Sequence, residues 1–313
     1  YHEKYFCKNK QKHNILNFIQ NSKGIWSNKS YSTLLFYLVF LILFGLIISQ
    51  LLACLFCMLV FNESFFLGGS LEVHIESLKT IQFFNALGTF IFPTIAFIHL
   101  RGLSFYNYLK LNFFQFNRLQ ILLFVLAIVM IPLANYMGAI NQHLPYPEVL
   151  SFLKDFEEQS LWLTEQFLQM DTYFDFLLMI LLIAVVASVG EELLFRGILQ
   201  NLFQEWFASK HASVWMTAFL FSVMHLQYHA ILPRFVLGAV IGYVYLISGN
   251  LFYSILLHFF YNSILVLITF MIRHEILEES WNVFGEGDVT LFVFALLIFL
   301  SLFFKLIKPQ IDH

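Results

Sequence analysis

The sequence predicts an all-α, polytopic membrane helix bundle with about eight transmembrane helices and a polar site inside the membrane. Of the 313 residues, 59% are apolar and only 12% are charged, whereas an ordinary soluble domain carries roughly 25% charged residues. The mean hydropathy of +0.75 places the chain in the same class. Several long apolar stretches also contain charged or imidazole side chains, and such residues are rare in a membrane unless they serve a function.

The apolar stretches define the expected spans. A bilayer core of about 30 Å is crossed by roughly 20 apolar helical residues. The fifth and sixth stretches are the shortest, so their ends are the least sharply defined. The eight expected spans are 33–61, 81–100, 119–140, 176–203, 212–226, 234–248, 251–272 and 290–307.

The first 31 residues are polar and basic. The apolar stretch after them is longer than the signal-peptide core of about 7–15 residues, so we expect it to be retained as a membrane helix. Cys54 and Cys57 lie one turn apart in this stretch. Buried free thiols are favoured there over a metal pair, because no second Cys or His pair accompanies them.

Charge alternates between successive connecting segments. The N-terminal segment, residues 101–118 and the C-terminal end are basic, whereas residues 62–80, 141–175 and 273–289 are acidic. The positive-inside rule places the basic segments in the cytoplasm. Both termini are then cytoplasmic, which requires an even number of spans.

The fourth span contains two adjacent glutamates, Glu191 and Glu192. Glu192 and Arg196 are four residues apart, so they share a helix face and can form an ion pair. Glu191 points about 100° away and is left for a partner on another helix. Gly190 and Gly197 flank the pair and allow a neighbouring helix to approach closely. A buried salt bridge that only fixes packing is the structural alternative, and it suits Glu192 and Arg196 better than Glu191.

Two later spans bring imidazoles into the membrane. His225 ends the fifth span, one turn after Phe221. His258 and Asn262 are four residues apart in the seventh span, so they lie on one helix face. Each group alone could be a satisfied core residue or interhelical glue. Together with Glu191 they are the groups needed to hold a water, remove its proton and stabilise an oxyanion.

These residues form three motifs in order. EExxxR is Glu191, Glu192 and Arg196, FxxxH is Phe221 and His225, and HxxxN is His258 and Asn262. In this arrangement the chain resembles the CAAX-protease and bacteriocin-processing (CPBP) family, also called the Abi or type II CAAX prenyl endopeptidase family. The motifs cover roughly residues 176–270, and no motif position departs from the pattern.

The resemblance implies an eight-helix bundle with an active site inside the membrane that opens toward the cytoplasm. It implies that Glu191 and His225 activate a water, that His258 and Asn262 stabilise the oxyanion, and that Glu192, Arg196 and Phe221 support them. No cofactor is favoured. The alternative is a zinc ion held by Glu191, His225 and His258, a His₂Glu set with an open position.

The expected organisation has five regions. Residues 141–175 contain apolar side chains at helical spacing with acids between them, which predicts an amphipathic helix at the outer interface or over the bundle. A packed connecting helix is favoured there over a substrate-gating role. The regions are 1–31, a basic cytoplasmic segment; 32–140, three membrane helices; 141–175, the extracytoplasmic connector; 176–272, the catalytic core; and 273–313, an acidic loop and the last membrane helix.

The sequence lacks the motifs of other intramembrane protease types. No HExxH motif is present, and no Ser stands in a GxSG context. Residues 285–288 match the GxGD motif of presenilin-like aspartyl proteases, but they lie in a polar acidic loop and not in a membrane span. Two further classes of protein could use the polar residues. One is a non-proteolytic membrane scaffold or immunity factor that keeps the polar site for folding or partner binding. The other is a transporter, which the lack of an inverted repeat disfavours.

The expected partners are a peptide or membrane-protein substrate and the lipid bilayer, with no nucleic acid. The short form, with little beyond the bundle, favours a location in a bacterial cytoplasmic membrane.

Overall fold

A computed structural model describes residues 24–62, 74–111 and 117–311, and over these residues it contains helices and no strands. The predicted all-α class is confirmed. Residues 1–23 of the predicted basic cytoplasmic segment 1–31 lie outside the described residues. In chain order the helices are α2 (Tyr31–Val60), α3 (Ile75–Ala86), η1 (Leu87–Ile91), α4 (Phe92–Arg101), α5 (Phe105–Tyr108), α6 (Arg118–Gln142), η2 (Glu148–Leu150), α7 (Leu153–Phe167), α8 (Tyr173–Met179), η3 (Ile180–Val186), α9 (Ala187–Glu192), η4 (Leu193–Gln200), α10 (Asn201–Phe207), α11 (Lys210–Val223), η5 (Tyr228–Ala230), α12 (Ile231–Ser248), α13 (Leu251–Arg273), η6 (Glu279–Val283) and α14 (Val289–Ile311).

Seven of these helices or continuous helical runs, within the described residues, are long and apolar enough to cross a membrane. They correspond to seven of the eight predicted spans, and the chain is an integral membrane protein. The exception is the predicted span 212–226, which is α11. It has 14 residues, or about 21 Å of helix at 1.5 Å per residue, and this is less than the bilayer core.

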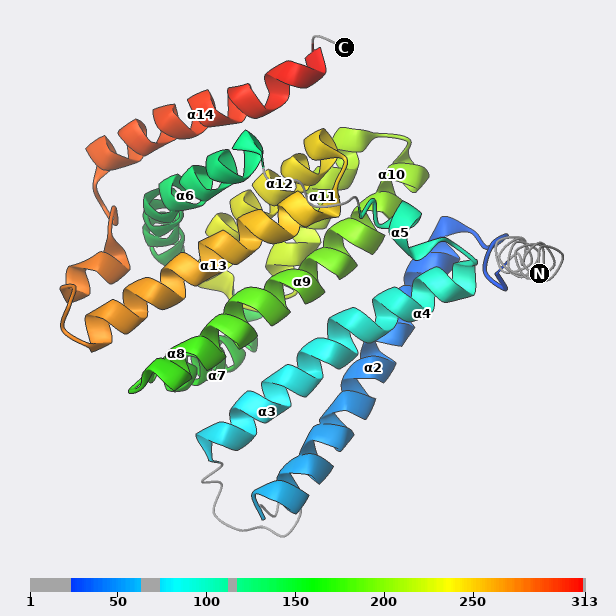
Figure 1. Ribbon diagram of the computed structural model, residues 1–313, viewed down its shortest axis with the longest axis horizontal. Helices are drawn as coiled ribbons and strands as arrows, with labels where there is room; N and C mark the ends of the chain where they lie inside the picture. The colour runs from blue at the N-terminus through cyan, green and yellow to red at the C-terminus, as the bar shows by residue number, and fades with distance from the viewer. Residues whose placement is uncertain (1–23, 63–73, 112–116, 312–313) are drawn as a thin grey trace, which may run out of the picture.

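The helices form a bundle in which α2 and α14 lie at opposite edges (Figure 1). Between them, the run α3–η1–α4 packs on α2, and the long run from α8 to α10 packs on η1 and α4. α13 packs on η3 and α9, and α6 lies between α13 and α14. α11 and α12 form a hairpin that also contacts η4. The run α8–α10 is therefore covered on several sides, and every residue of its η4 segment, Leu193–Gln200, is buried.

Capping side chains at helix N-termini explain where the breaks between successive helices lie. Asn117 and Gln120 form a capping box at the start of α6, and Thr172 and Asp175 form another at the start of α8. Each box satisfies backbone N–H groups that a helix end leaves without partners. Asn250 caps α13 in the same way, so the predicted break between the sixth and seventh spans is confirmed.

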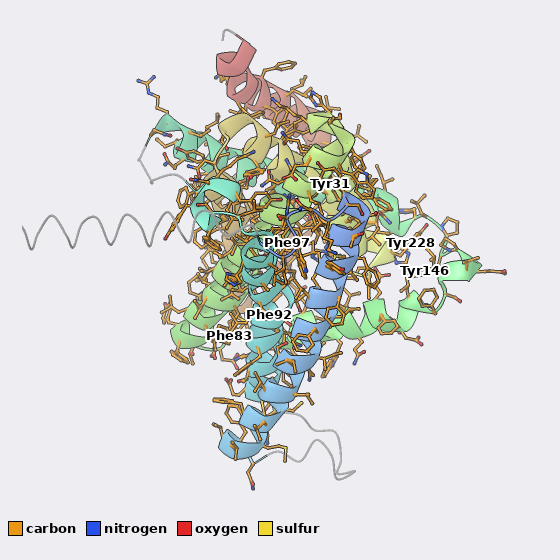
Figure 2. All side chains as sticks on the ribbon, turned by 90° about the vertical axis from the view of Figure 1, so that its right-hand side faces the viewer. Tyr31, Phe83, Phe92, Phe97, Tyr146 and Tyr228 are labelled. Atoms are coloured by element: carbon orange, nitrogen blue, oxygen red, sulfur yellow. The ribbon has the colours of Figure 1, made fainter. Side chains whose placement is uncertain are left out.

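Small residues allow two close helix contacts. A Cβ on Gly45 of α2 would stand 2.0 Å from the carbonyl oxygen of Gly88 in η1. On α12, a Cβ on Gly238 would stand 3.2 Å from the Cα of Ala218 in α11. Glycine is therefore required for these backbones to approach. Figure 2 shows Phe83, Phe92 and Phe97 following one another along the helical run that packs on α2.

One end of the bundle, which we call the basic end, gathers cations. It contains the starts of α2, α6, α11 and α13 and the ends of α4, α10, α12 and α14. Contacts join these segments, since the Trp26 N–H donates to Leu100 O at 3.0 Å and the Leu251 N–H donates to Lys110 O at 3.2 Å. The Arg101 guanidinium also pairs with Glu205 at 3.1 Å. The described cations of this end are Lys29, Arg101, Lys110, Arg118, Lys210 and Lys305.

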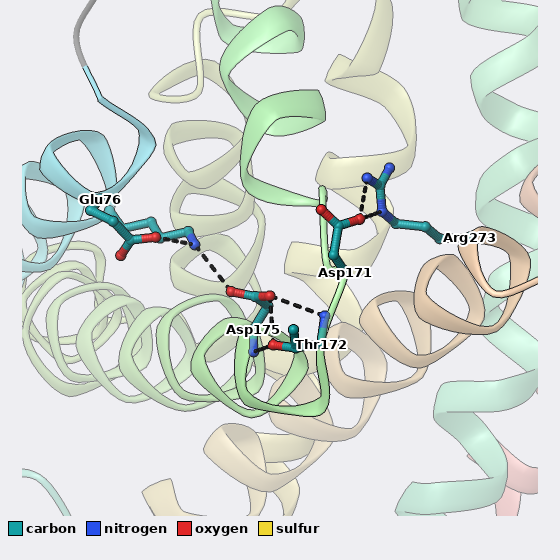
Figure 3. A network of polar contacts seen from close by, with 6 residues as sticks. Glu76, Asp171, Thr172, Asp175 and Arg273 are labelled. Atoms are coloured by element: carbon teal, nitrogen blue, oxygen red, sulfur yellow. Dashed lines mark hydrogen bonds and ion pairs between the residues drawn. The ribbon is translucent and has the colours of Figure 1, made fainter.

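The opposite end, which we call the acidic end, is joined by ion pairs (Figure 3). Lys79 of α3 lies 3.7 Å from Asp175 of α8, and the Arg273 Nε of α13 donates to Asp171 at 2.8 Å. These pairs tie three spans together. The described acids of this end are Glu76, Glu148, Asp155, Glu157, Glu158, Glu165, Asp171, Asp175, Glu275, Glu278, Glu279, Glu286 and Asp288.

Candidate active site

Both glutamates of the EExxxR motif lie near the middle of one continuous helix, Tyr173–Phe207. They end the short α-helical segment Ala187–Glu192, and π-helical segments directly precede and follow this segment. A π-helical turn shifts backbone hydrogen bonding by one residue and is frequent at functional sites. Backbone carbonyls of both π-helical segments accept hydrogen bonds from side chains, Ile183 O from Asn262 and Gly197 O from Asn201.

Glu192 is fully buried and bridges two other side chains. Its Oε1 accepts a hydrogen bond from Arg196 Nη1 at 2.6 Å and is 2.9 Å from His258 Nδ1. The predicted pairing of Glu192 with Arg196 is confirmed. A carboxylate at Nδ1 favours a proton on that nitrogen, so Glu192 fixes the ring orientation of His258 and directs Nε2 elsewhere.

Arg196 ties this cluster to the α11–α12 hairpin. Its Nη2 donates to Gly238 O of α12 at 2.8 Å, and its guanidinium carbon lies 4.9 Å from the centre of the Phe221 ring. A guanidinium over an aromatic face is an attractive contact. The charge of Arg196, which is 0% exposed, is therefore offset by Glu192, a carbonyl and a ring.

Glu191 faces a different direction from Glu192, as the helical spacing predicts. Its side chain is 13% exposed, and its Oε2 lies 3.9 Å from His258 Nε2. This distance is too long for a direct hydrogen bond and suits two groups that contact the same water. His258 therefore lies between the two glutamates, bonded to Glu192 and facing Glu191.

His225 lies in the turn after α11, at the same cavity. Its Nδ1 is 2.7 Å from Phe221 O. A carbonyl can only accept, so Nδ1 carries the proton and Nε2 of the neutral ring is an acceptor. The Phe221 ring centre is 5.0 Å from the His225 ring and 6.0 Å from the His258 ring. Counting residues from the membrane ends predicts different depths for the two histidines. Both nevertheless line the same cavity as Glu191, which lies near the middle of its helix.

Asn262 makes an interhelical contact with the π-helical segment before α9. Its Nδ2 donates to Ile183 O at 3.0 Å. The amide nitrogen carries a second hydrogen, and Asn262 also lines the cavity that Glu191, His225 and His258 line. All four residues predicted to be catalytic therefore lie around one cavity.

That cavity has a volume of about 670 Å³, within the usual range for a ligand site. Residues of α7 form part of its wall, and α7 is attached to the chain just after His225. Gln227 Nε2 donates to Ser160 Oγ at 2.6 Å, and the His229 N–H donates to Glu157 at 3.0 Å. Figure 2 shows Tyr146 beside Tyr228 in this region, with ring centres 4.7 Å apart. The amphipathic connector is a helix, as predicted, and it covers the cavity.

Sequence reasoning missed Arg234. This residue lies in the first turns of α12 and lines the cavity together with Glu191 and Tyr261. Its Nη1 is buried and has no hydrogen-bond partner among the described residues. A buried guanidinium nitrogen without a partner is costly. The only available signal was a single arginine within an apolar span, which marks a functional position by default.

The zinc alternative requires three ligating side chains that converge on one point. Within the described part of the chain, no three His, Cys, Asp or Glu side chains converge to hold a metal ion. Glu191, His225 and His258 are therefore not assembled as a ligand set in this structure, and the metal-free mechanism is taken up below as a proposal.

Comparison with protein families gives one match. Residues 173–264 match the family described as "Type II CAAX prenyl endopeptidase Rce1-like". The matched region contains all three motifs and the helices that carry them, and the resemblance inferred from the motifs is confirmed. Comparison with curated proteins and with solved structures gives no match. Residues 173–264, somewhat under a third of the chain, are therefore similar to the type II CAAX prenyl endopeptidase Rce1-like family.

Proposed function

We propose that this protein is an intramembrane endopeptidase that hydrolyses peptide bonds with a water activated by Glu191 and His225. One observation carries the proposal. Glu191 and His258 Nε2 face each other at 3.9 Å in a cavity that His225 and Asn262 also line. The arrangement leaves room for a water between a base and a hydrogen-bond donor.

In the proposed reaction, the Glu191 carboxylate takes a proton from the water, and the hydroxide attacks the carbonyl carbon of the scissile bond. His225 helps to hold the water, because its Nε2 is free to accept a hydrogen bond. The proton on Glu191 then passes to the nitrogen of the departing amine as the C–N bond breaks. General base catalysis of this kind is worth about 10²–10⁴-fold in rate.

The tetrahedral intermediate places a negative charge on the former carbonyl oxygen. When both ring nitrogens of His258 are protonated, Nδ1 donates to Glu192 and Nε2 donates into the cavity. The second amide hydrogen of Asn262 is the other proposed donor. Such donors stabilise an oxyanion in a water-poor site, and losing one costs roughly 10²–10³-fold in rate.

Glu192, Arg196 and Phe221 act as positioning residues in this proposal. They contact His258 of α13 or each other from three elements, α9, η4 and α11, and do not provide the reacting base. The proposed substrate is a membrane-associated or C-terminal peptide. No metal is assigned to the proposed reaction.

The test compares Glu191→Gln with wild type on a library of leader-like and C-terminal peptides, with products identified by mass spectrometry. We expect Glu191→Gln to abolish cleavage while the protein stays folded. Glu205→Gln is the matched control, because it makes the same change in the same helical run at the basic end. Each protein is assayed with and without a zinc chelator.

The glutamate mechanism is supported if wild type and Glu205→Gln cleave the peptides equally with and without the chelator, while Glu191→Gln does not cleave them. Loss on chelation with recovery on adding zinc contradicts the metal-free proposal. Equal cleavage by wild type and Glu191→Gln contradicts the site assignment.

A membrane scaffold or immunity factor is the second candidate, and one observation favours it. The buried Glu192–Arg196–His258 cluster joins three elements of the bundle, so selection for folding alone would retain it. Cellular function that survives Glu191→Gln would support this candidate over the peptidase.

A further inference from the structure

The cavity and the charge pattern bear on which side of the membrane the site faces. The family resemblance implies an opening toward the cytoplasm, whereas the charge pattern implies cytoplasmic termini. These two expectations are compatible only if the cavity opens at the basic end. The end of the bundle at which the cavity opens therefore decides whether both expectations can hold.

The cavity opens at the acidic end. Its exposed lining residues mark the mouth, and all of them lie in the half of the bundle nearer that end. They come from α3, the end of α6, α7 and the segment between α13 and α14. These residues are Gln82, Gln142, Thr164, Asn282, Val283 and Glu286.

The basic end is closed by packed side chains. Between His258 and that end, Asn201 Nδ2 donates to the Tyr245 hydroxyl at 2.9 Å and to Tyr108 O at 3.0 Å. Leu109 and Leu251 are fully buried at the same level. None of the residues that line the cavity belongs to the described segments of the basic end. Water and peptide therefore have no route to Glu191 from that side in this structure.

The cations identify which end is cytoplasmic. The basic end carries six described Lys and Arg residues, named above. The acidic end carries Lys79, Lys154 and Arg273, and two of these three are paired with carboxylates. By the positive-inside rule the basic end lies in the cytoplasm.

We infer that the proposed peptidase site opens to the extracytoplasmic side of the membrane. This inference rests on the proposed function for its substrate class. The substrates are then exported peptides, or the extracytoplasmic ends of membrane proteins, that reach Glu191 from the acidic end. Peptides confined to the cytoplasm are excluded.

The first experiment measures the side of the mouth without using activity. Single cysteines are introduced as Glu286→Cys at the mouth and Lys210→Cys at the basic end, in a parent with Cys7→Ser, Cys54→Ala and Cys57→Ala. Intact cells are treated with a membrane-impermeant maleimide, before and after permeabilisation. Both introduced positions are exposed, so each can react once the reagent reaches it.

We expect Glu286→Cys to be labelled on intact cells and Lys210→Cys to be labelled only after permeabilisation. The opposite pattern overturns the inference and places the mouth in the cytoplasm. The cysteine-replaced parent gives the background, and equal amounts of the three proteins in the membrane show that the variants fold and insert.

The second experiment adds a cleavable, membrane-impermeant peptide from the library to right-side-out and to inside-out vesicles. We expect cleavage only in right-side-out vesicles, and cleavage only in inside-out vesicles overturns the inference. If labelling is as expected but neither vesicle cleaves any peptide, the proposed peptidase function fails while the orientation of the cavity stands.

Discussion

The adjacent glutamates Glu191 and Glu192 have different environments in this protein. Glu192 is 0% exposed and bonded to Arg196 and His258, whereas Glu191 reaches the cavity and has no bond shorter than 3.9 Å to His258. Helical geometry separates neighbouring side chains by about 100°, so the contrast was predictable from the sequence. The proposed mechanism follows this contrast, with Glu192 as a positioning residue and Glu191 as the base.

We expect Glu192→Gln to destabilise the protein by about 3–5 kcal/mol, because it leaves the buried Arg196 charge without its partner. Glu191→Gln should change stability by less than about 1 kcal/mol, since the contact of Glu191 with His258 Nε2, at 3.9 Å, is too long for a hydrogen bond. Unfolding in detergent, followed by circular dichroism, measures both. A larger loss for Glu191→Gln would mean that the two roles are reversed.

Arg234 has a buried guanidinium nitrogen without a described partner, next to the cavity. We expect it to bind a carboxylate of the substrate. Arg234→Gln should raise the KM for a peptide with a free C-terminal carboxylate about tenfold, equivalent to about 1.4 kcal/mol. The KM for the same peptide with an amidated terminus should change little.

Arg273→Gln is the matched control, because Arg273 is exposed at the acidic end and pairs with Asp171. An equal effect of Arg234→Gln on the free and the amidated peptide would show that Arg234 supports the fold and does not recognise a carboxylate.

At the scale of elements, the π-helical segments around α9 depend on contacts with neighbouring helices. Asn262 donates to Ile183 O in the segment before α9, and Gln200 of the segment after it donates to Gly242 O of α12 at 3.1 Å. Both bonds join a side chain of one helix to a backbone carbonyl of another. They therefore form a matched pair for mutation, one at the cavity and one away from it.

We expect Asn262→Ala and Gln200→Ala to lose similar stability, about 0.6–1.7 kcal/mol each, the range measured for interhelical hydrogen bonds in membranes. Asn262→Ala should also lower kcat about 10²–10³-fold, as removal of an oxyanion donor does. Gln200→Ala should keep the kcat of the folded protein. Equal kcat values for the two variants would remove Asn262 from the proposed oxyanion site.

Most of the membrane-spanning helices were predictable from the sequence, and there are physical reasons why the other helical features were not. Seven of the eight predicted spans match helices long enough to cross a membrane, because hydropathy over about 20 residues is a strong signal. The π-helical segments were not predicted, because they depend on partners such as Asn262 that lie far away in sequence. The spacing of Gly238 and Gly242 was an available signal for the close α11–α12 contact, and sequence reasoning did not use it.

At the scale of the whole molecule, the motifs predicted which residues meet, but they did not predict how the cavity is enclosed. Glu191, His225, His258 and Asn262 all line it, as expected from polar groups that must find one another within a bilayer. The cover formed by α7 and the mouth at the acidic end depend on the packing of connecting segments. Such contacts have no periodic pattern in the sequence.

The short α11 has a consequence for the lipid around the site. Its 14 residues extend about 21 Å, and several of its apolar side chains are exposed on the surface of the bundle, where acyl chains would cover them. These side chains are Trp215, Met216, Phe219 and Val223. A hydrophobic surface shorter than the bilayer is accommodated by local thinning, which costs a fraction of a kcal/mol per Å of mismatch.

The turnover of the enzyme should therefore depend on acyl chain length. We expect cleavage to be faster in bilayers of 14-carbon lipids than in bilayers of 20-carbon lipids, measured in proteoliposomes with equal protein incorporation. Extending α11 by one helical turn should reduce the difference, and equal rates in all lipids for the wild-type protein would contradict the expectation. A thinned bilayer beside His225 would bring the polar surface of the membrane closer to the scissile bond, so membrane thickness itself would set the rate of proteolysis.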